Sequence, residues 1–155
     1  MIALVVNGRT VTVDCAPDRP LLHAIRDGGP AGLAATPTGC LIGMCGVCTV
    51  HLDGQAVRSC EVTLEQAQGR AITTFEGLMA TAAGRELAQA WARHGVSPCG
   101  RCRSGQVMTV AALLARNPAP SDDDIDAALA EHVCNCDEPG DVYAAVREAA
   151  RVLCA

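Results

Sequence analysis

Aromatic side chains are scarce in this chain of 155 residues, and clusters of basic residues are missing. Phe, Trp and Tyr occur once each, so the core must be built from slim aliphatic side chains that bury modest area. The formal net charge is -5, and no basic run offers a surface for phosphates. These features argue against nucleic acid or an anionic membrane as a partner.

Long apolar runs are missing as well. The opening "MIALVVNGRT" has no positive n-region, and its apolar run ends at an Asn7-Gly8 turn, so it predicts a strand and not a secretory signal. The apolar segment 107–115 is far shorter than the roughly 18 residues of a membrane span. No Ser-His-Asp order, phosphate loop or HExxH is found, so we predict no catalytic residue and no direct membrane span.

Cysteine, in contrast, is abundant, with ten residues. Without a secretion signal, disulfides are the least favoured explanation, and thiolate ligands of a metal are favoured. A first group has the spacing C-x4-C-x2-C-x11-C, which is the plant-type ferredoxin spacing for a [2Fe-2S] cluster. Glycines at 39, 43 and 46 allow the backbone to approach such a cluster. The predicted ligands of this first cysteine group are Cys40, Cys45, Cys48 and Cys60.

A second group combines the pairs "CGRC" and "CNC". Two predicted helices lie between the pairs, and successive helices reverse direction, so the pairs can meet at one end of a bundle. Structural zinc is the alternative for both groups and a serious one for this group, because C-x2-C also occurs in zinc sites. The predicted ligands of this second cysteine group are Cys99, Cys102, Cys134 and Cys136.

The other thiols and the histidines receive structural interpretations. Cys15 and Cys154 are expected to be buried or frayed. Because each group already supplies four thiolates, the histidines are interpreted as packing or surface residues and not as Rieske-type ligands. They are His23, His51, His94 and His132.

The pattern of elements changes near residue 75. Residues 1–75 predict a hairpin around Asn7-Gly8, a helix over 21–27, a hairpin around Asp53-Gly54 and a strand at 71–75, an α+β unit. Residues 76–155 predict four helices, over about 77–95, 105–116, 121–132 and 141–153, as a small bundle. We therefore expect two domains, divided at residues 75 and 76.

The order of the eight cysteines resembles the small iron-sulfur subunit of the xanthine oxidase family of molybdenum hydroxylases. Supporting stretches are "CGVCTVHLDG", "ITTFEGL", "LAQAWARHGVSPCGRCRSGQVM" and "NPAPSDDDIDAAL", and the last two are most similar to the isoquinoline 1-oxidoreductase alpha-subunit group. The resemblance implies an N-terminal β-grasp ferredoxin domain and a C-terminal four-helix bundle. It also implies that Gln106 and Cys136 lie at a molybdopterin cytosine dinucleotide cofactor held by a partner subunit.

The implied function is electron transfer within an oxidoreductase complex that oxidises aldehydes or N-heterocycles on a partner chain. Two [2Fe-2S] clusters would relay electrons from a large molybdenum-cofactor subunit to a cytochrome c or flavin acceptor. Alternatives are a freestanding two-cluster ferredoxin and a zinc-stabilised binding module. Cluster insertion predicts the cytoplasm, with the periplasm as the alternative for an exported complex.

Three stretches depart from the family pattern, and the third carries a testable prediction. Leu41 stands where relatives usually have glycine, and Arg103-Ser104 stands where they often have Thr-Pro or Gln-Ser. "CNCDEPGD" replaces C-R-C-G-T-Y, which adds Asp137 and Glu138 beside the second group. Negative charge there predicts a lower potential for that cluster than in relatives, and an Asp137→Gly chain whose potential did not rise would contradict this.

Overall fold

The N-terminal half is built on one mixed sheet. In the computed structural model, which describes residues 1–27, 36–98, 100–136 and 140–153, the strand order is β2-β1-β5-β3-β4. The strands are β1 (Ile2–Val6), β2 (Arg9–Val13), β3 (Thr49–Leu52), β4 (Gln55–Arg58) and β5 (Ala71–Thr73). β5 lies in the middle, parallel to β1 and antiparallel to β3.

Both predicted hairpins are present. Asn7 and Gly8 have φ of 50° and 77°, and Asp53 and Gly54 have φ of 51° and 81°. Positive φ at both central residues is the turn geometry that matches the twist of paired strands. These turns pair β1 with β2 and β3 with β4 antiparallel, which fixes where Cys48 and Cys60 flank the second hairpin.

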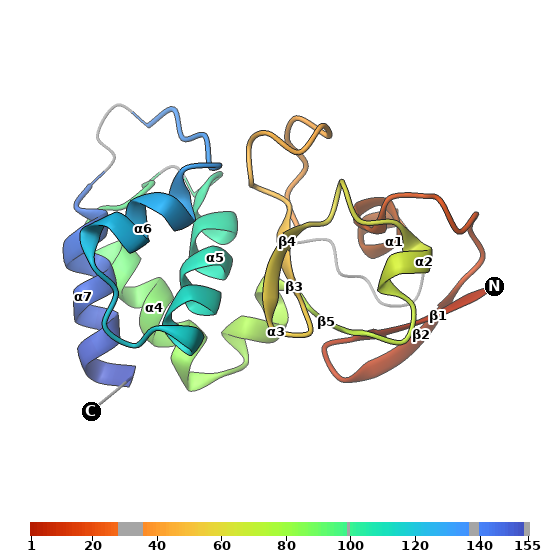
Figure 1. The fold of residues 1–155 in the computed structure, drawn as a ribbon, viewed down its shortest axis with the longest axis horizontal. Coiled ribbons are helices and arrows are strands. Elements are labelled where there is room, and N and C mark those ends of the chain that lie inside the picture. The colour runs from red at the N-terminus through yellow and green to blue at the C-terminus, as the bar shows by residue number, and fades with distance from the viewer. Residues whose placement is uncertain (28–35, 99, 137–139, 154–155) are drawn as a thin grey trace.

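Two helices cover the sheet (Figure 1). Helix α1 (Leu21–Asp27) was predicted and buries Leu21, Leu22, Ala24 and Ile25. Helix α2 (Leu64–Ala67) was not predicted, because its four residues are too few for an apolar periodicity. Its start was visible only as a capping box, in which the Thr63 and Gln66 side chains each accept from the other's backbone N–H.

The C-terminal half is helical, as predicted. Its helices are α3 (Phe75–Met79), α4 (Ala82–Arg93), α5 (Arg103–Arg116), α6 (Asp122–Leu129) and α7 (Val142–Leu153). The single helix predicted over about 77–95 is two helices. The Thr81 hydroxyl donates to the Leu78 carbonyl and accepts from the Gly84 N–H, so it ends one helix turn and starts α4.

Each half has its own hydrophobic cluster. One gathers residues of the sheet, α1 and α2, among them Leu4, Leu21 and Ile72. The other gathers residues of α3 to α7 around Trp91 and Met108. The two halves meet where β3 faces α5 (Figure 1). There the Nε2–H of His51 donates to the Met108 carbonyl at 2.6 Å. The α+β fold class is confirmed.

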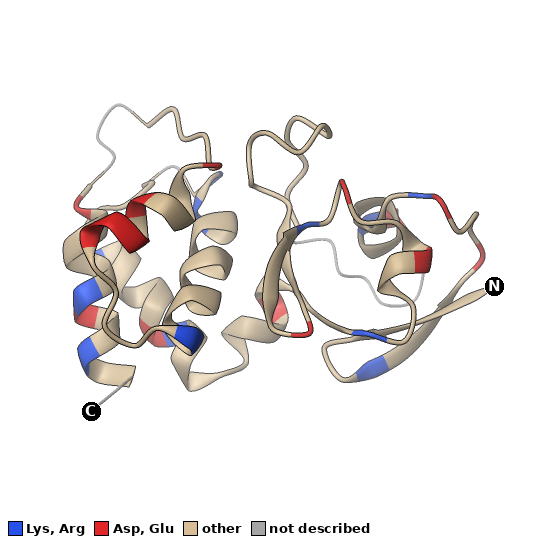
Figure 2. Cartoon of the chain, viewed as in Figure 1, with Lys and Arg blue, Asp and Glu red and all other residues tan. Residues whose placement is uncertain are grey.

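Charged residues lie on the outer faces of the helices. Figure 2 shows acidic residues on α6 beside basic residues on α7, and Arg147 and Asp122 form an ion pair between these helices. None of the helices in the described ranges is both long enough and apolar enough to cross a bilayer.

Candidate functional site

The first cysteine group lies in a loop that directs backbone N–H groups at sulfur. Cys40 Sγ accepts from the N–H groups of Ile42, Met44 and Cys45, at 3.5, 3.2 and 3.3 Å. The loop can turn inward in this way because Leu41, Gly43 and Gly46 all have φ between 63° and 75°. Such a nest of N–H groups is an anion site built from backbone alone.

These contacts divide the thiols of the loop into two kinds. Hydrogen bonds from the backbone of Ile42, Cys45 and Met44 lower the pKa of Cys40 to about 6. Burial, the Cys48 thiol and neighbouring charge raise the pKa of Cys60 to about 11. Cys40 is therefore a thiolate at neutral pH, whereas Cys60 needs a positive partner such as a metal to lose its proton.

The backbone of this loop also leaves no space for side chains next to sulfur. A Cβ at Gly39 would lie 2.4 Å from Cys45 Sγ and 2.6 Å from a Val47 methyl group. A Cβ closer than about 3 Å forces the structure to shift, so only glycine fits at position 39. The thiols, the N–H groups and the missing side chain together fit an anionic iron-sulfur cluster.

The second cysteine group gathers around the start of α5. Cys102 is the N-cap residue of that helix, and its Sγ donates to the Val133 carbonyl at 3.4 Å. Burial alone would raise the pKa of Cys134, but hydrogen bonds with the Ser97 hydroxyl, the Cys136 backbone and the thiols of Cys102 and Cys136 lower it. Three predicted ligands therefore lie together, and Cys99 lies outside the described residues.

Each cysteine group offers thiols, which are the ligands of a [2Fe-2S] cluster. In the described ranges, no three His, Cys, Asp or Glu side chains are grouped as ligands of one metal ion. A [2Fe-2S] cluster makes a different demand, since two irons share four thiolates. The residues that would hold such clusters are those of the two cysteine groups, and their ligand roles stay predictions.

The two cysteine groups meet at a seam of backbone contacts. The Val133 N–H donates to the Cys45 carbonyl at 3.1 Å, one residue before Cys134. On α5, a Cβ at Gly105 would lie 2.3 Å from the Gly46 carbonyl oxygen, so the helix and the first loop touch backbone to backbone. We call these contacts, of Cys45 with Val133 and of Gly46 with Gly105, the seam. Sequence reasoning missed it, because no local pattern reports a contact between segments this far apart.

Gln106 is buried next to the second group, with 8% of its surface exposed. Its Oε1 accepts from Trp91 Nε1 at 3.3 Å and from Ser97 Oγ at 2.7 Å. An indole N–H can only donate, so these contacts fix which end of the amide is oxygen. The Nε2 group of Gln106 has no hydrogen bond among the described residues and is available as a donor. Ser97 was not predicted as a site residue.

The histidines near the two groups make packing contacts and hydrogen bonds. His132 Nε2 bonds the Thr109 hydroxyl at 2.7 Å, and its ring lies against Gly46. Burial and the nearby Arg58 lower the pKa of His132 to about 4, so the ring is neutral. His94 pairs with Glu148, and His23 lies near Asp27.

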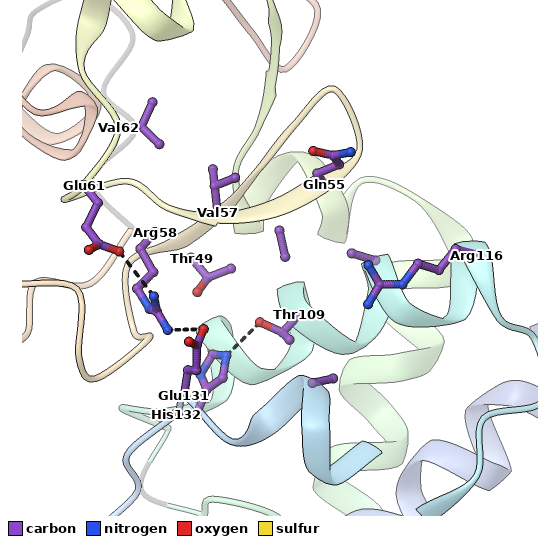
Figure 3. A pocket seen from close by; sticks show the side chains of 13 residues that line it. Thr49, Gln55, Val57, Arg58, Glu61, Val62, Thr109, Arg116, Glu131 and His132 are labelled. Carbon is purple, nitrogen blue, oxygen red and sulfur yellow. Dashed lines mark hydrogen bonds and ion pairs between the residues drawn. The ribbon is translucent and has the colours of Figure 1, made fainter. Parts of the chain in front are cut away.

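A cleft of about 580 Å³ opens beside the seam, lined by residues of both halves. In it Arg58, at the end of β4, forms ion pairs with Glu61 at 3.2 Å and with Glu131, which follows α6 (Figure 3). The arginine side chain is 19% exposed, but those of Glu61 and Glu131 are 53% and 73% exposed, so solvent screens these pairs. Arg58 thus adds a charged link between the halves.

Family models match both halves. A "2Fe-2S iron-sulfur cluster binding domain" matches residues 4–74, and a "[2Fe-2S] binding domain" matches residues 74–147. The matches meet at residue 74, where the sheet gives way to helices.

Similar proteins extend over almost the whole chain. A nicotinate dehydrogenase subunit of Pseudomonas putida is 44% identical over 149 residues, which cover 96% of this chain and 94% of the relative. The alpha subunit of isoquinoline 1-oxidoreductase of Brevundimonas diminuta is 40% identical over 152 residues, 97% of this chain and 98% of the relative.

Solved structures agree with the sequence matches. Quinoline 2-oxidoreductase from Pseudomonas putida 86 contains a chain with a TM-score of 0.81 and 32% identity, over 96% of this chain and 89% of that chain. Aldehyde oxidoreductase from Desulfovibrio gigas has a TM-score of 0.85 and 33% identity over 99% of this chain, which spans only 17% of that chain.

Proposed function

Since this chain belongs to the iron-sulfur subunits of the xanthine oxidase family of molybdenum hydroxylases, it is an electron-transfer subunit of an oxidoreductase complex, and we propose the route that electrons take through it. The first cysteine group holds one [2Fe-2S] cluster and the second group, completed by Cys99, holds another. Each bound cluster accepts and releases one electron. The chain itself supplies the thiolates, the N–H donors and the shielding.

The seam is the observation that carries this route. The Cys45 carbonyl and the Val133 N–H link the two groups by one hydrogen bond, with Cys134 one residue further along the chain. Ligands of both clusters are thereby joined through one residue, and the backbone contacts between Gly46 and Gly105 hold the segments at that spacing.

Gln106 and Cys136 form the end of the route that faces the partner. We place them at a molybdopterin cytosine dinucleotide held by a large partner subunit. The support is the orientation of the Gln106 amide, since Trp91 and Ser97 hold its oxygen inside and leave Nε2 as a donor. A fixed amide of this kind can position a cofactor without reorganising when electrons leave it.

The tip of the first loop forms the other end. Leu41, Ile42 and Met44 are 46%, 68% and 63% exposed, directly outside the N–H groups that bond Cys40. Apolar groups at a redox centre exclude water when a partner docks. We propose that a cytochrome c or flavin subunit receives electrons here.

The names of the relatives bear on the substrate of the complex. Nicotinate and isoquinoline are N-heterocycles, so an N-heterocycle is the favoured substrate class, with aldehydes second, and the site that oxidises it lies on the partner chain. We propose the cytoplasm as the compartment, with the periplasm as the alternative for an exported complex.

Metal analysis and EPR of the tagged chain test this function. We expect about four irons per chain, two distinct [2Fe-2S] signals after dithionite reduction, and a large molybdenum-containing subunit that copurifies. Cys102→Ser should remove one signal and keep the other. Zinc or a single iron pair would contradict the two-cluster proposal. A chain that carries both clusters but purifies without a partner would indicate a freestanding ferredoxin.

A further inference from the structure

Ser97 lies between Gln106 and a thiol of the second cysteine group. Its side chain is enclosed, with 1% of the residue exposed, and its φ of 46° directs the chain away from the ordinary extended path. Its Oγ lies 2.7 Å from Gln106 Oε1 and 3.3 Å from Cys134 Sγ. The same hydroxyl therefore contacts both the amide that we place at the pterin and a cysteine that we place at the cluster.

This hydroxyl has one proton for two acceptors. A cysteine that ligates a cluster has no proton to donate, so Gln106 Oε1 and Cys134 Sγ compete for the serine proton. Trp91 also donates to Gln106 Oε1, at 3.3 Å, so this oxygen keeps one donor in either case.

We propose that Ser97 is a positioning residue whose hydroxyl turns toward Cys134 when the second cluster is reduced and toward Gln106 when it is oxidised. This rests on the proposed function, because it takes Cys134 as a ligand. An added electron makes the thiolate a stronger acceptor, and hydrogen bonds to charged groups are stronger than neutral ones. The proton stays on Ser97, so the change is a rotation about the Cβ–Oγ bond.

The rotation links the charge of the cluster to the donor strength of the amide. With Ser97 and Trp91 both donating to Oε1, the Gln106 amide is more polarised and its Nε2–H groups are stronger donors. When the serine turns to Cys134, one of these bonds is lost and Nε2 becomes a weaker donor. Arrival of an electron thus loosens the contact that we assign to the pterin.

Redox titration of the full-length chain with both clusters, followed by EPR, tests the proposal through two substitutions with opposite expected signs. Ser97→Ala removes the hydrogen bond that the Ser97 hydroxyl makes to Cys134 Sγ mainly when the second cluster is reduced, so the potential of that cluster falls. In the half-reduced chain, the ratio of reduced first cluster to reduced second cluster should rise about tenfold, as for the loss of one hydrogen bond to a charged group. Gln106→Leu removes the competing acceptor, so that potential rises.

Ser59→Ala is the matched control. Ser59 is fully buried like Ser97, but its hydroxyl donates to the Cys48 carbonyl at 2.7 Å and not to a sulfur. We expect it to leave the second potential unchanged. Shifts of the same sign in Ser97→Ala and Gln106→Leu, or no shift in Ser97→Ala, would overturn the proposal.

If Ser97→Ala does not fold, Gln106→Leu decides alone, since a rise supports the shared hydroxyl and a fall or no change rejects it. If the unchanged chain lacks two [2Fe-2S] signals, the proposed function itself fails, which is a separate result.

Discussion

The two cysteine groups stabilise negative charge with different parts of the chain. The first group relies on backbone N–H groups, three of which bond Cys40. The second adds a side-chain donor, the Ser97 hydroxyl, to the backbone N–H of Cys136, and it lies at the N-terminus of α5, where the helix dipole favours a thiolate. Backbone donors remain when side chains change, so substitutions should tune the second cluster more readily than the first.

Among these substitutions, Gly105→Ala should have the largest effect, because it would push the two cysteine groups apart. The added methyl group would lie 2.3 Å from the Gly46 carbonyl oxygen, and backbone on both sides cannot yield cheaply. We expect a loss of about 2–3 kcal/mol in the free energy of unfolding, despite the better helix propensity of alanine. Denaturant unfolding measures the loss, and freeze-quench EPR should show slower exchange between the clusters.

Gly69→Ala is the control for that substitution. Gly69 has φ of 74°, but its missing side chain faces open space. Only the cost of a left-handed alanine, about 1 kcal/mol, is expected, with exchange between the clusters unchanged. Equal losses in both variants would mean that the contact of Gly105 with Gly46 adds nothing.

Without metal, Cys40 and Cys60 of the first group should differ in their rates of alkylation. The pKa of Cys40 is about 6 and that of Cys60 about 11, so at pH 7 Cys40 is mostly thiolate and Cys60 mostly thiol. After allowing for the weaker nucleophilicity of a low-pKa thiolate, Cys40 should be alkylated roughly fiftyfold faster in the metal-free chain. Mass spectrometry after timed iodoacetamide treatment measures both rates, and equal rates would contradict the assigned N–H nest.

Acid should weaken the seam through His132. Its pKa is about 4 in the folded chain, below the ordinary value near 6.5. A depressed histidine pKa stabilises the fold above pH 6.5, and this stabilisation is lost as pH falls toward 4. We expect a loss of about 1–2 kcal/mol between pH 7 and pH 5 in urea unfolding. His132→Gln should reduce that pH dependence, and an unchanged pH dependence in this variant would contradict the role of His132.

Leu41→Gly is expected to give the smallest effect, which combines a gain in stability with weaker docking of the electron acceptor. Leu41 has φ of 63°, a region that costs a branched side chain about 1 kcal/mol, so glycine should raise the free energy of unfolding by about that amount. It should also weaken docking of the electron acceptor. Met44→Ala is the matched control, because Met44 is also exposed but has no left-handed φ, and only docking should suffer.

Local patterns were sufficient for much of the fold. Asn7-Gly8 and Asp53-Gly54 fixed two hairpins, apolar spacing located α1 and α5, and a capping box of Ser121 and Asp124 marked the start of α6. The break at Thr81 could not be predicted from periodicity, since α3 and α4 continue the same apolar pattern across it. There a single hydroxyl decides the boundary by bonding both sides of the turn.

The candidate site divides in the same way. The spacing of Cys40, Cys45 and Cys48 located the first loop, because its chemistry is local. The contact of Val133 with Cys45 and the position of Ser97 depend on how distant segments pack, and the sequence has no local signal for either. Asp137 and Glu138, which predict a lowered potential, lie outside the described residues, and that prediction stands untested.

Spin coupling between the two reduced clusters tests the central claim most directly. If Cys45 and Val133 join the two groups, full reduction should split each [2Fe-2S] EPR signal through interaction with the other unpaired electron, and half reduction should leave the signals unsplit. Two signals that stay unsplit at full reduction, or only one signal at any potential, would contradict a route through the seam.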